Sequence, residues 1–347
     1  MKKIYLLPIF FSVLIFSQNK TDAKIKVNEG IELHDSGKYA EALAKYNEAL
    51  NLDKDNSLAL TEKAMTLESV KRYDEAIEVS KQVLKLYPNE DNRTLYVTYA
   101  NSLDHLNKTD LALKVYDEAL KKYPDYYQLY FNKGISLVNA KENEKALIEF
   151  QKATKLNPNH SSSYNALAIL GQSNRIASIL AFSRYLVIDN KSGRAKGNFD
   201  TLIKLMKKGV SQSGDKSVSV SIDSATLDKV NKKKKGENDF SSTDMILSLA
   251  SALDYDDKNK DKTEVQKFIS KFETLCRSMS ESQKNQKGYY WEFLAPYFIE
   301  MEKKNLIEPF AYTIFRPSQN PDIIQYNKEH SDKIEEFQNW SKNYNWK

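Results

Sequence analysis

The sequence predicts an all-α protein in which about five helical hairpins stack on one another and precede a C-terminal helical module. The main observation is a repeat, because small, aromatic and proline residues return every 34 to 36 positions. Helix-breaking residues are also scarce, with 10 Gly and 8 Pro in 347 residues. Hydrophobic residues make up 41% of the chain and charged residues 29%, which is typical of a globular protein.

The first 17 residues are predicted to be a signal peptide. A lysine-led start precedes an apolar run from Ile4 to Phe16, and the chain turns polar at Gln18. This run is shorter than the roughly 20 residues that span a bilayer, so we expect cleavage after Ser17 rather than a permanent anchor. A lipid anchor would need a cysteine there, but the only cysteine is Cys276. We expect a soluble mature protein in the periplasm or cell envelope, or secreted, with no integral membrane segment.

The repeat consists of five columns of residues in one register. They are Ala42, Ala76, Ala112 and Ala146; Pro88, Pro124 and Pro158; Gly30, Ala64, Ala100, Gly134 and Ala168; Tyr96, Tyr130 and Tyr164; and Tyr46, Ser80, Tyr116 and Phe150. Antiparallel helices approach closely only where both carry small side chains, so we expect Gly30 opposite Ala42 and Gly134 opposite Ala146. Aromatic residues then fill the gaps, and each proline ends one helix before the next begins.

This pattern resembles the tetratricopeptide repeat, as residues 30–52 (GIELHDSGKYAEALAKYNEALNL) and 73–88 (YDEAIEVSKQVLKLYP) show. The resemblance extends over residues 23 to about 190. Its repeats are residues 23–56, 57–90, 93–126 and 127–160, and a shorter fifth from 161 to about 190. In the fifth, the turn is expected at Gly171, with Ser178 and Phe182 in the small and aromatic columns.

The resemblance implies a right-handed superhelix whose concave groove binds a protein or peptide partner. In this family the first helix of each hairpin lines the groove. That geometry places nine residues there: Val27, Ile31, Thr61, Met65, Val97, Asn101, Phe131, Ile135 and Asn165. We therefore expect an exported interaction or scaffold protein.

Many family members grip the terminal carboxylate of a peptide with Lys, Asn and Arg side chains, and this chain lacks that clamp. Only Asn101 and Asn132 match its positions. The expected groove is instead largely apolar. Two explanations stay open: the groove holds an outside polypeptide, or it is filled by the protein's own C-terminal region, which would make the protein purely structural.

Residues 191–209 are predicted to be a capping helix, and residues 210–239 a polar linker. Phe199, Leu202 and Met206 share one face of the helix, and lysines on the other face would solvate the end of the stack. We predict a loop for the linker, although Val218 and Val220 alternate with serines as in a short edge strand. The lysine run at 232–235 is expected to be solvated, because a formal net charge of +5 does not imply a nucleic-acid partner.

Residues 240–347 are predicted to form a C-terminal helical module that resembles no family known to us. A helix should begin within Ser241–Asp244. A later helix carries an apolar face made by Val265, Phe268, Ile269, Phe272, Leu275, Cys276 and Met279. All three tryptophans lie in this module among many other aromatic residues, and we expect these rings to form its core.

No catalytic, metal or cofactor site is predicted. The four histidines are scattered, and Cys276 has no base beside it in the sequence. Asp257, Asn259 and Asp261 begin like a calcium loop, but Lys262 and Phe268 stand where such a loop needs glycine and glutamate. The alternative from another functional class is an enzyme, such as a hydrolase, housed in the C-terminal module.

Overall fold

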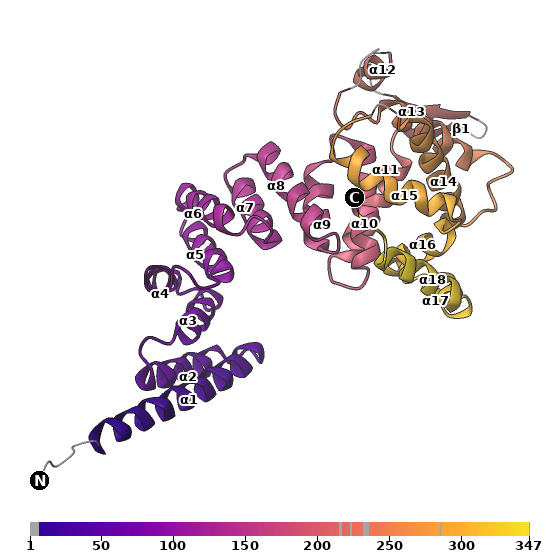
Figure 1. Ribbon diagram of the computed structural model, residues 1–347. Helices are drawn as coiled ribbons and strands as arrows, with labels where there is room; N and C mark the ends of the chain where they lie inside the picture. The colour runs from indigo at the N-terminus through magenta and orange to yellow at the C-terminus, as the bar shows by residue number, and fades with distance from the viewer. Residues whose placement is uncertain (1–6, 215–216, 223, 232–235, 285, 347) are drawn as a thin grey trace, which may run out of the picture. The chain divides into compact units, whose positions relative to one another are not determined.

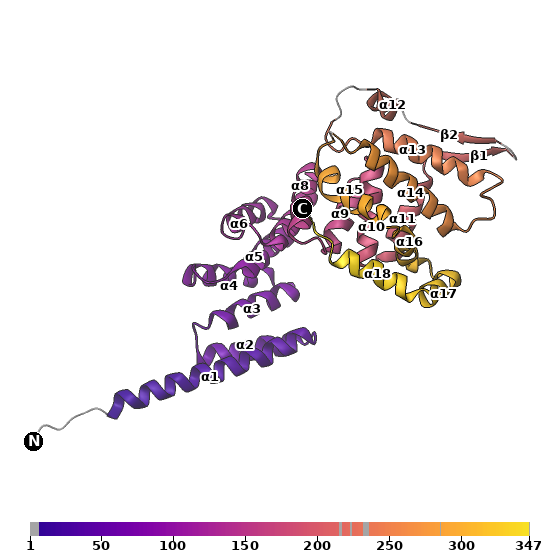
Figure 2. The same ribbon diagram turned by 45° about the vertical axis from the view of Figure 1, so that its right-hand side comes forward.

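The computed structural model describes residues 7–214, 217–222, 224–231, 236–284 and 286–346. Within these ranges the chain folds into eighteen α-helices, a few short helical turns and one two-stranded sheet (Figures 1 and 2). The chain forms two compact units, Met1–Glu149 and Phe150–Lys347. The prediction of an all-α repeat protein is confirmed.

The first unit consists of successive helical hairpins, seen as paired helices in Figure 2. The helices are α1 (Leu7–Asp35), α2 (Tyr39–Leu52), α3 (Ser57–Ser69), α4 (Tyr73–Leu86), α5 (Arg93–His105), α6 (Thr109–Lys122), α7 (Tyr127–Asn139) and α8 (Asn143–Leu156), which crosses the unit boundary. One residue in each hairpin turn has a left-handed backbone. The φ angles are 75° at Gly37, 64° at Lys71, 58° at Asn107 and 62° at Lys141. Glycine adopts this conformation without a steric penalty and asparagine tolerates it, so the local strain falls on the two lysine turns.

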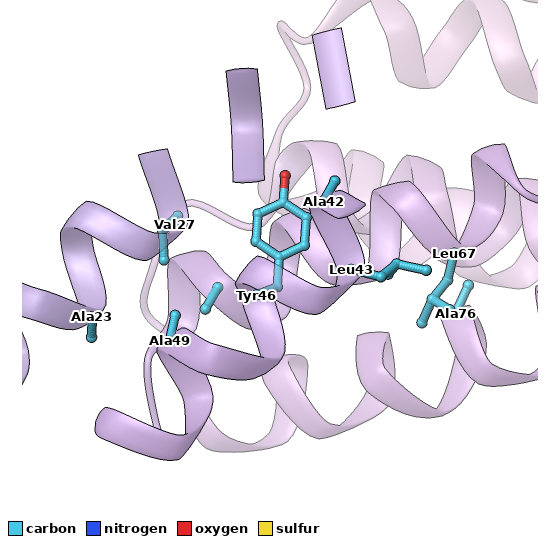
Figure 3. Packing of buried hydrophobic residues seen from close by; sticks show 9 residues of the cluster. Ala23, Val27, Ala42, Leu43, Tyr46, Ala49, Leu67 and Ala76 are labelled. Carbon is cyan, nitrogen blue, oxygen red and sulfur yellow. The ribbon is translucent and has the colours of Figure 1, made fainter. Parts of the chain in front are cut away.

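The recurring columns form the core of the hairpins. Every member of the alanine column is fully buried, as are Tyr46, Tyr116 and Phe150. A side chain at Gly30 would collide with the ring of Tyr46, so the close approach expected at Gly30 involves this ring. Figure 3 shows the cluster around Tyr46, which joins α1 and α2 to their neighbours. The prolines lie just after α4, α6 and α8, as predicted.

The second unit begins with the fifth hairpin and continues into the C-terminal helices. Its elements are α9 (Ser161–Leu170), α10 (Arg175–Ile188), α11 (Ala195–Lys207), β1 (Val210–Gly214), β2 (Ser217–Val220), α12 (Ser224–Val230), α13 (Ser241–Ala252), α14 (Glu264–Ser282), α15 (Ala295–Lys303), α16 (Ile307–Ile314), α17 (Pro321–Glu329) and α18 (Ser331–Lys342). The early turn of the fifth hairpin is confirmed: α9 ends before Gly171, and Ser178 and Phe182 are buried.

Helix α10 is the centre of the second unit, with α9, α11, α13 and α16 packed around it (Figure 2). This arrangement corrects the expected role of α11 as the solvated end of a stack. Its buried residues Phe199, Leu202 and Met206 lie under downstream elements, because α11 packs against α10, α13 and the Arg316–Ser318 turn. The Phe199 and Phe315 rings, for example, meet edge to face with centroids 4.8 Å apart.

The loop predicted for residues 210–239 is also corrected. Strands β1 and β2 form an antiparallel hairpin in which Val210 pairs with Val220 and Gln212 with Val218. The alternation of valine with serine therefore indicated a strand, and both strands contact α13. Helix α12 follows in the same segment. The lysine run at 232–235 lies outside the described residues.

The C-terminal apolar residues form a core, as expected. Helix α13 begins at Ser241, and the predicted face of α14 is buried apart from half-buried Ile269. Cys276 is fully buried in this core, and burial raises the pKa of its thiol. Most of the aromatic side chains between residues 289 and 315 are buried as well. Within the described ranges, no helix combines the length and the apolar character that a bilayer span requires.

Candidate binding surfaces

The structure separates the nine predicted groove residues into three groups. Val27 is fully buried in the cluster around Tyr46, so it belongs to the core and offers nothing to a partner, which corrects its assignment to the groove. Asn165 lies in the second unit, where its side chain accepts a hydrogen bond of 2.7 Å from Asn198. The other seven residues lie on the first helices of the first unit.

We call these seven residues the first-helix face. They are Ile31 on α1, Thr61 and Met65 on α3, Val97 and Asn101 on α5, and Phe131 and Ile135 on α7. Six are half-buried, and Ile135 is 39% exposed. Ile31 and Val97 also pack against the hairpin cores, so the face is continuous with the core beneath it.

The face is more polar than its sequence suggested, because two carboxylates of α3 lie beside it. Burial raises the pKa of Glu62, and the negative charge of Asp35 adds to this shift. Burial also raises the pKa of Glu68, while hydrogen bonding by Asn101 and Thr98 opposes the shift. No ion pair to either carboxylate is found among the described residues. The α3 part of the face is thus a partly desolvated acidic surface.

A network of hydrogen bonds fixes the polar side chains near these carboxylates. The Tyr116 hydroxyl donates to Asn101, and burial together with the charges of Glu68 and Asp104 raises the pKa of this tyrosine well above its usual value. Asn132 donates to the backbone carbonyl of Gln128 over 2.9 Å. The two asparagines that match the family's carboxylate clamp therefore already have partners within the chain.

The acidic residues could have been found from helical spacing. Glu68 follows Met65 by three positions, and Asp104 follows Asn101 by three, which places each pair on one helix face. The sequence-based prediction named the apolar residues of the face but left out the acidic residues one helical turn further along. What the sequence did not show is the depth of burial, which depends on the neighbouring helices.

Besides a pocket of about 540 Å³ at the start of α11, the second unit contains two further sizeable pockets. One, of about 910 Å³, lies between α15 and the end of α18 and is lined mainly by polar side chains together with Trp340 and Tyr344. The other, of about 460 Å³, lies among α11, α14, α16 and α17 and has an apolar interior. Neither contains a group of histidine, cysteine and acidic residues suited to a metal, and no such group occurs elsewhere in the described part of the chain.

Comparison with known proteins identifies the repeat region. Residues 31–169 match the family model described as the N-terminal TPR repeats region of Psidin. This region is built of tetratricopeptide repeats. The match spans the first four hairpins from Ile31 onward and includes most of α9 of the fifth. No curated protein matches the chain.

Several solved structures are similar to part of this chain. PilF of Pseudomonas aeruginosa is 17% identical, with 55% of this chain and 85% of PilF covered and a TM-score of 0.49. TTC0263 of Thermus thermophilus, described as a thermophilic TPR protein, is 20% identical, with 52% and 98% covered and a TM-score of 0.46. PilW, described as a type IV pilus biogenesis factor, is 22% identical, with 53% and 90% covered and a TM-score of 0.43. Similarity at this level carries no inference about partners.

Proposed function

We propose that this protein is an exported scaffold that binds a polypeptide partner through the first-helix face of its tetratricopeptide repeats. The observation that carries the proposal is a row of half-buried side chains on α1, α3, α5 and α7 that the hairpin cores do not fully enclose. Stacked helical hairpins create an extended surface of this kind, and such surfaces are the usual binding sites of repeat proteins.

The chemistry of the face favours a partner segment with both apolar and basic side chains. Met65, Val97 and Phe131 supply apolar contacts, and Phe131 is the largest of them. Burial raises the pKa of Glu62 and of Glu68, because their negative charges are poorly solvated. A cation placed beside these carboxylates would offset the unfavourable desolvation. This proposal concerns the first unit alone.

Replacement of Phe131 by alanine tests the proposal. Affinity capture from a native envelope extract with the wild-type protein first identifies the partner. Phe131→Ala should then weaken its binding by about 2 kcal/mol, the loss typical of a central aromatic anchor, with almost no change in melting temperature. Ile148→Ala is the matched control, because Ile148 is 51% exposed on the second helix α8.

The opposite pattern would show that the face is occupied by the protein's own chain. In that case Phe131→Ala lowers stability and leaves capture unchanged. Cleavage near Gly236 does not distinguish the two versions, because α10 packs against α13 and α16 from the other side of that cut and the fragments would stay associated in either case. Unchanged capture and unchanged stability in Phe131→Ala together would rule out both versions.

Export is the second part of the proposal, and the position of the repeat core supports it. Among the side chains that the structure describes, the cluster around Tyr46 begins at Ala23, so cleavage after Ser17 would remove none of these residues. Helix α1 has 29 residues, whereas α3 and α5 have 13 each, and cleavage would bring it closer to their length. In a Gram-negative host, we expect the mature protein in the periplasmic or envelope fraction with an N-terminus at or near Gln18. An intact Met1 on cytoplasmic protein would refute export.

A further inference from the structure

The pocket of about 460 Å³ in the second unit has the size of a small-ligand site. It lies among α11, the beginnings of α14 and α17, and the end of α16. Six side chains form its apolar walls: Phe199, Ile203, Val265, Tyr312, Phe315 and Ile323. Four of these are buried, and Ile203 and Tyr312 are half-buried, so the walls are part of the folded core.

The charged groups that line this pocket are all negative. Asp200, Glu264 and Asp322 contribute carboxylates, and no lysine, arginine or histidine is among the described residues of the lining. Burial raises the pKa of the Tyr312 hydroxyl, and the charges of Glu308 and Asp322 add to the shift, which indicates a negative potential at this wall. An apolar interior beneath three carboxylates suits a ligand that is apolar at one end and positive at the other.

Two of the carboxylates have lysine partners that lie outside the pocket lining. Lys196 pairs with Asp200 and Lys207 with Glu264, each at 2.5 Å, but the lysine side chains are 58% and 46% exposed. Ion pairs on the surface contribute only about 0 to 1 kcal/mol, so a ligand cation can replace them at little cost. No ion pair of Asp322 is found in the described part of the chain.

The helix ends at this pocket do not make it an anion site. The first turns of α14 and α17 would ordinarily attract a negative charge. Here Thr263 and Gln266 form a capping box at α14, and the Asn320 side chain accepts a hydrogen bond from the Asp322 amide at α17. Glu264 and Asp322 also place carboxylates in these first turns, so the exposed amides and the helix dipoles are already compensated.

We propose that this pocket binds an aliphatic cation, that is, an alkylammonium or alkylguanidinium group whose apolar stem enters the walls while its charge meets the three carboxylates. The same chemistry is found in a free amine and in the lysine or arginine side chain of a polypeptide. The site lies in the second unit and does not depend on the partner proposed for the repeats.

Ligand-observed NMR titration of the full-length protein tests this site with three probes of equal chain length. Hexylammonium should bind with a dissociation constant on the order of 1 mM, which corresponds to about 4 kcal/mol. Hexanol should bind more weakly, and hexanoate should not bind. Stronger binding by the blocked peptide acetyl-Leu-Lys-Leu-amide would identify a side chain as the ligand. Binding by hexylammonium alone would identify a free amine.

Variants separate the charge of the pocket from its shape. Asp322→Asn and Glu264→Gln should each weaken hexylammonium binding about tenfold, whereas Glu335→Gln, an exposed carboxylate of α18 outside the lining, should not. Ile203→Trp keeps the charges but fills the space, so it should abolish binding of both hexylammonium and hexanol. Melting curves establish that each variant is folded.

Three results would overturn the proposal. The first is equal binding of hexanoate and hexylammonium, which would assign the site to the helix ends. The second is unchanged affinity in folded Asp322→Asn and Glu264→Gln together. The third is full binding by folded Ile203→Trp, which would place the cation outside this pocket.

Discussion

Helices α6 and α10 occupy the same place in their hairpins, but their surroundings differ. Each is the second helix of a repeat and has 14 residues. In α6 the buried residues are Ala112, Val115, Tyr116 and Ala119, which form one stripe. In α10 all twelve residues from Arg175 to Leu186 are buried. The repeat motif therefore specifies how a helix pairs with its partner, while the rest of the chain decides whether its outer face meets water.

The difference is clearest at one pair of equivalent positions. Ser178 and Phe182 correspond to Ala112 and Tyr116 in the repeat, and by the same register Arg184 corresponds to Glu118. Glu118 is exposed. Arg184 is 1% exposed, and such burial of a charge is costly unless its hydrogen bonds are satisfied.

The chain supplies partners for the two terminal nitrogens of Arg184 from both ends of the second unit, while its buried Nε has none. Its guanidinium donates to Ser341 over 2.9 Å and to Asn159 over 2.8 Å. It also lies 4.9 Å from the ring centroids of both Tyr297 and Trp346, within cation–π range. One arginine of the fifth repeat thus joins α10 to α18 and to the segment after it.

Arg184→Ala is expected to have the largest effect of the substitutions considered. It should lower the free energy of unfolding of the second unit by about 3 kcal/mol, because it removes several buried hydrogen bonds and takes their donor from the Pro158 carbonyl and the Asn159 side chain. All three tryptophans lie in this unit, so urea unfolding followed by tryptophan fluorescence reports on it selectively.

Glu118→Ala provides the matched control, since it changes the equivalent position of α6. Its side chain accepts one hydrogen bond from Tyr96 at an exposed site, so the expected loss is at most about 1 kcal/mol. Equal losses from the two substitutions, each measured in its own unit, would mean that the contrast between the helices has no energetic counterpart.

The hairpins could be predicted because their spacing follows from local geometry. Columns of small residues mark where helices touch, and the structure buries them as expected. The central position of α10 depends on the non-repeating chain that follows, for which no periodicity gives the packing partners. One signal was present: Ile176, Ile179, Leu180 and Leu186 place apolar residues around the whole helix, which is typical of a helix without a solvent face.

Ala112→Leu is expected to have the next largest effect and tests the repeat contact itself. Ala112 is fully buried, so the added atoms should overpack the α5–α6 contact and cost about 1 to 3 kcal/mol. Hydrogen exchange of peptides from these two helices measures the change locally. The same substitution at exposed Ala40 is the control and should cost less than about 0.5 kcal/mol. Unchanged protection in α5 and α6 would refute the repeat register.

The candidate site was predicted less completely than the fold. The resemblance to tetratricopeptide repeats selected the first helices, and six of the nine residues lie half-buried on the face of the first unit. The prediction for Val27 was wrong because α1 places this residue in the core beside Tyr46 and Ala49. The carboxylates of α3 were missed because their importance comes from burial, which single-sequence patterns do not reveal.

Glu68→Gln should change the free energy of unfolding least, and it should raise this free energy where Arg184→Ala lowers it. Arg184 is held by hydrogen bonds and two aromatic rings, whereas burial raises the pKa of Glu68 despite the opposing hydrogen bonds of Asn101 and Thr98. A carboxylate with a raised pKa in the folded state holds its proton more tightly there than in the unfolded chain. Stability is therefore lost as pH rises from about 4.5 through the folded-state pKa.

Glutamine carries no charge at any pH, so Glu68→Gln should be more stable than the wild type at pH 7, by about 0.5 to 1 kcal/mol, and equal to it near pH 4. Hydrogen exchange of α3 peptides at the two pH values measures this difference, with exposed Glu32→Gln as the control. A loss of stability at pH 7 would show that Glu68 is well paired in the fold. A gain in stability together with weaker partner capture would show that the repeats retain a charge that is unfavourable for folding but useful for binding.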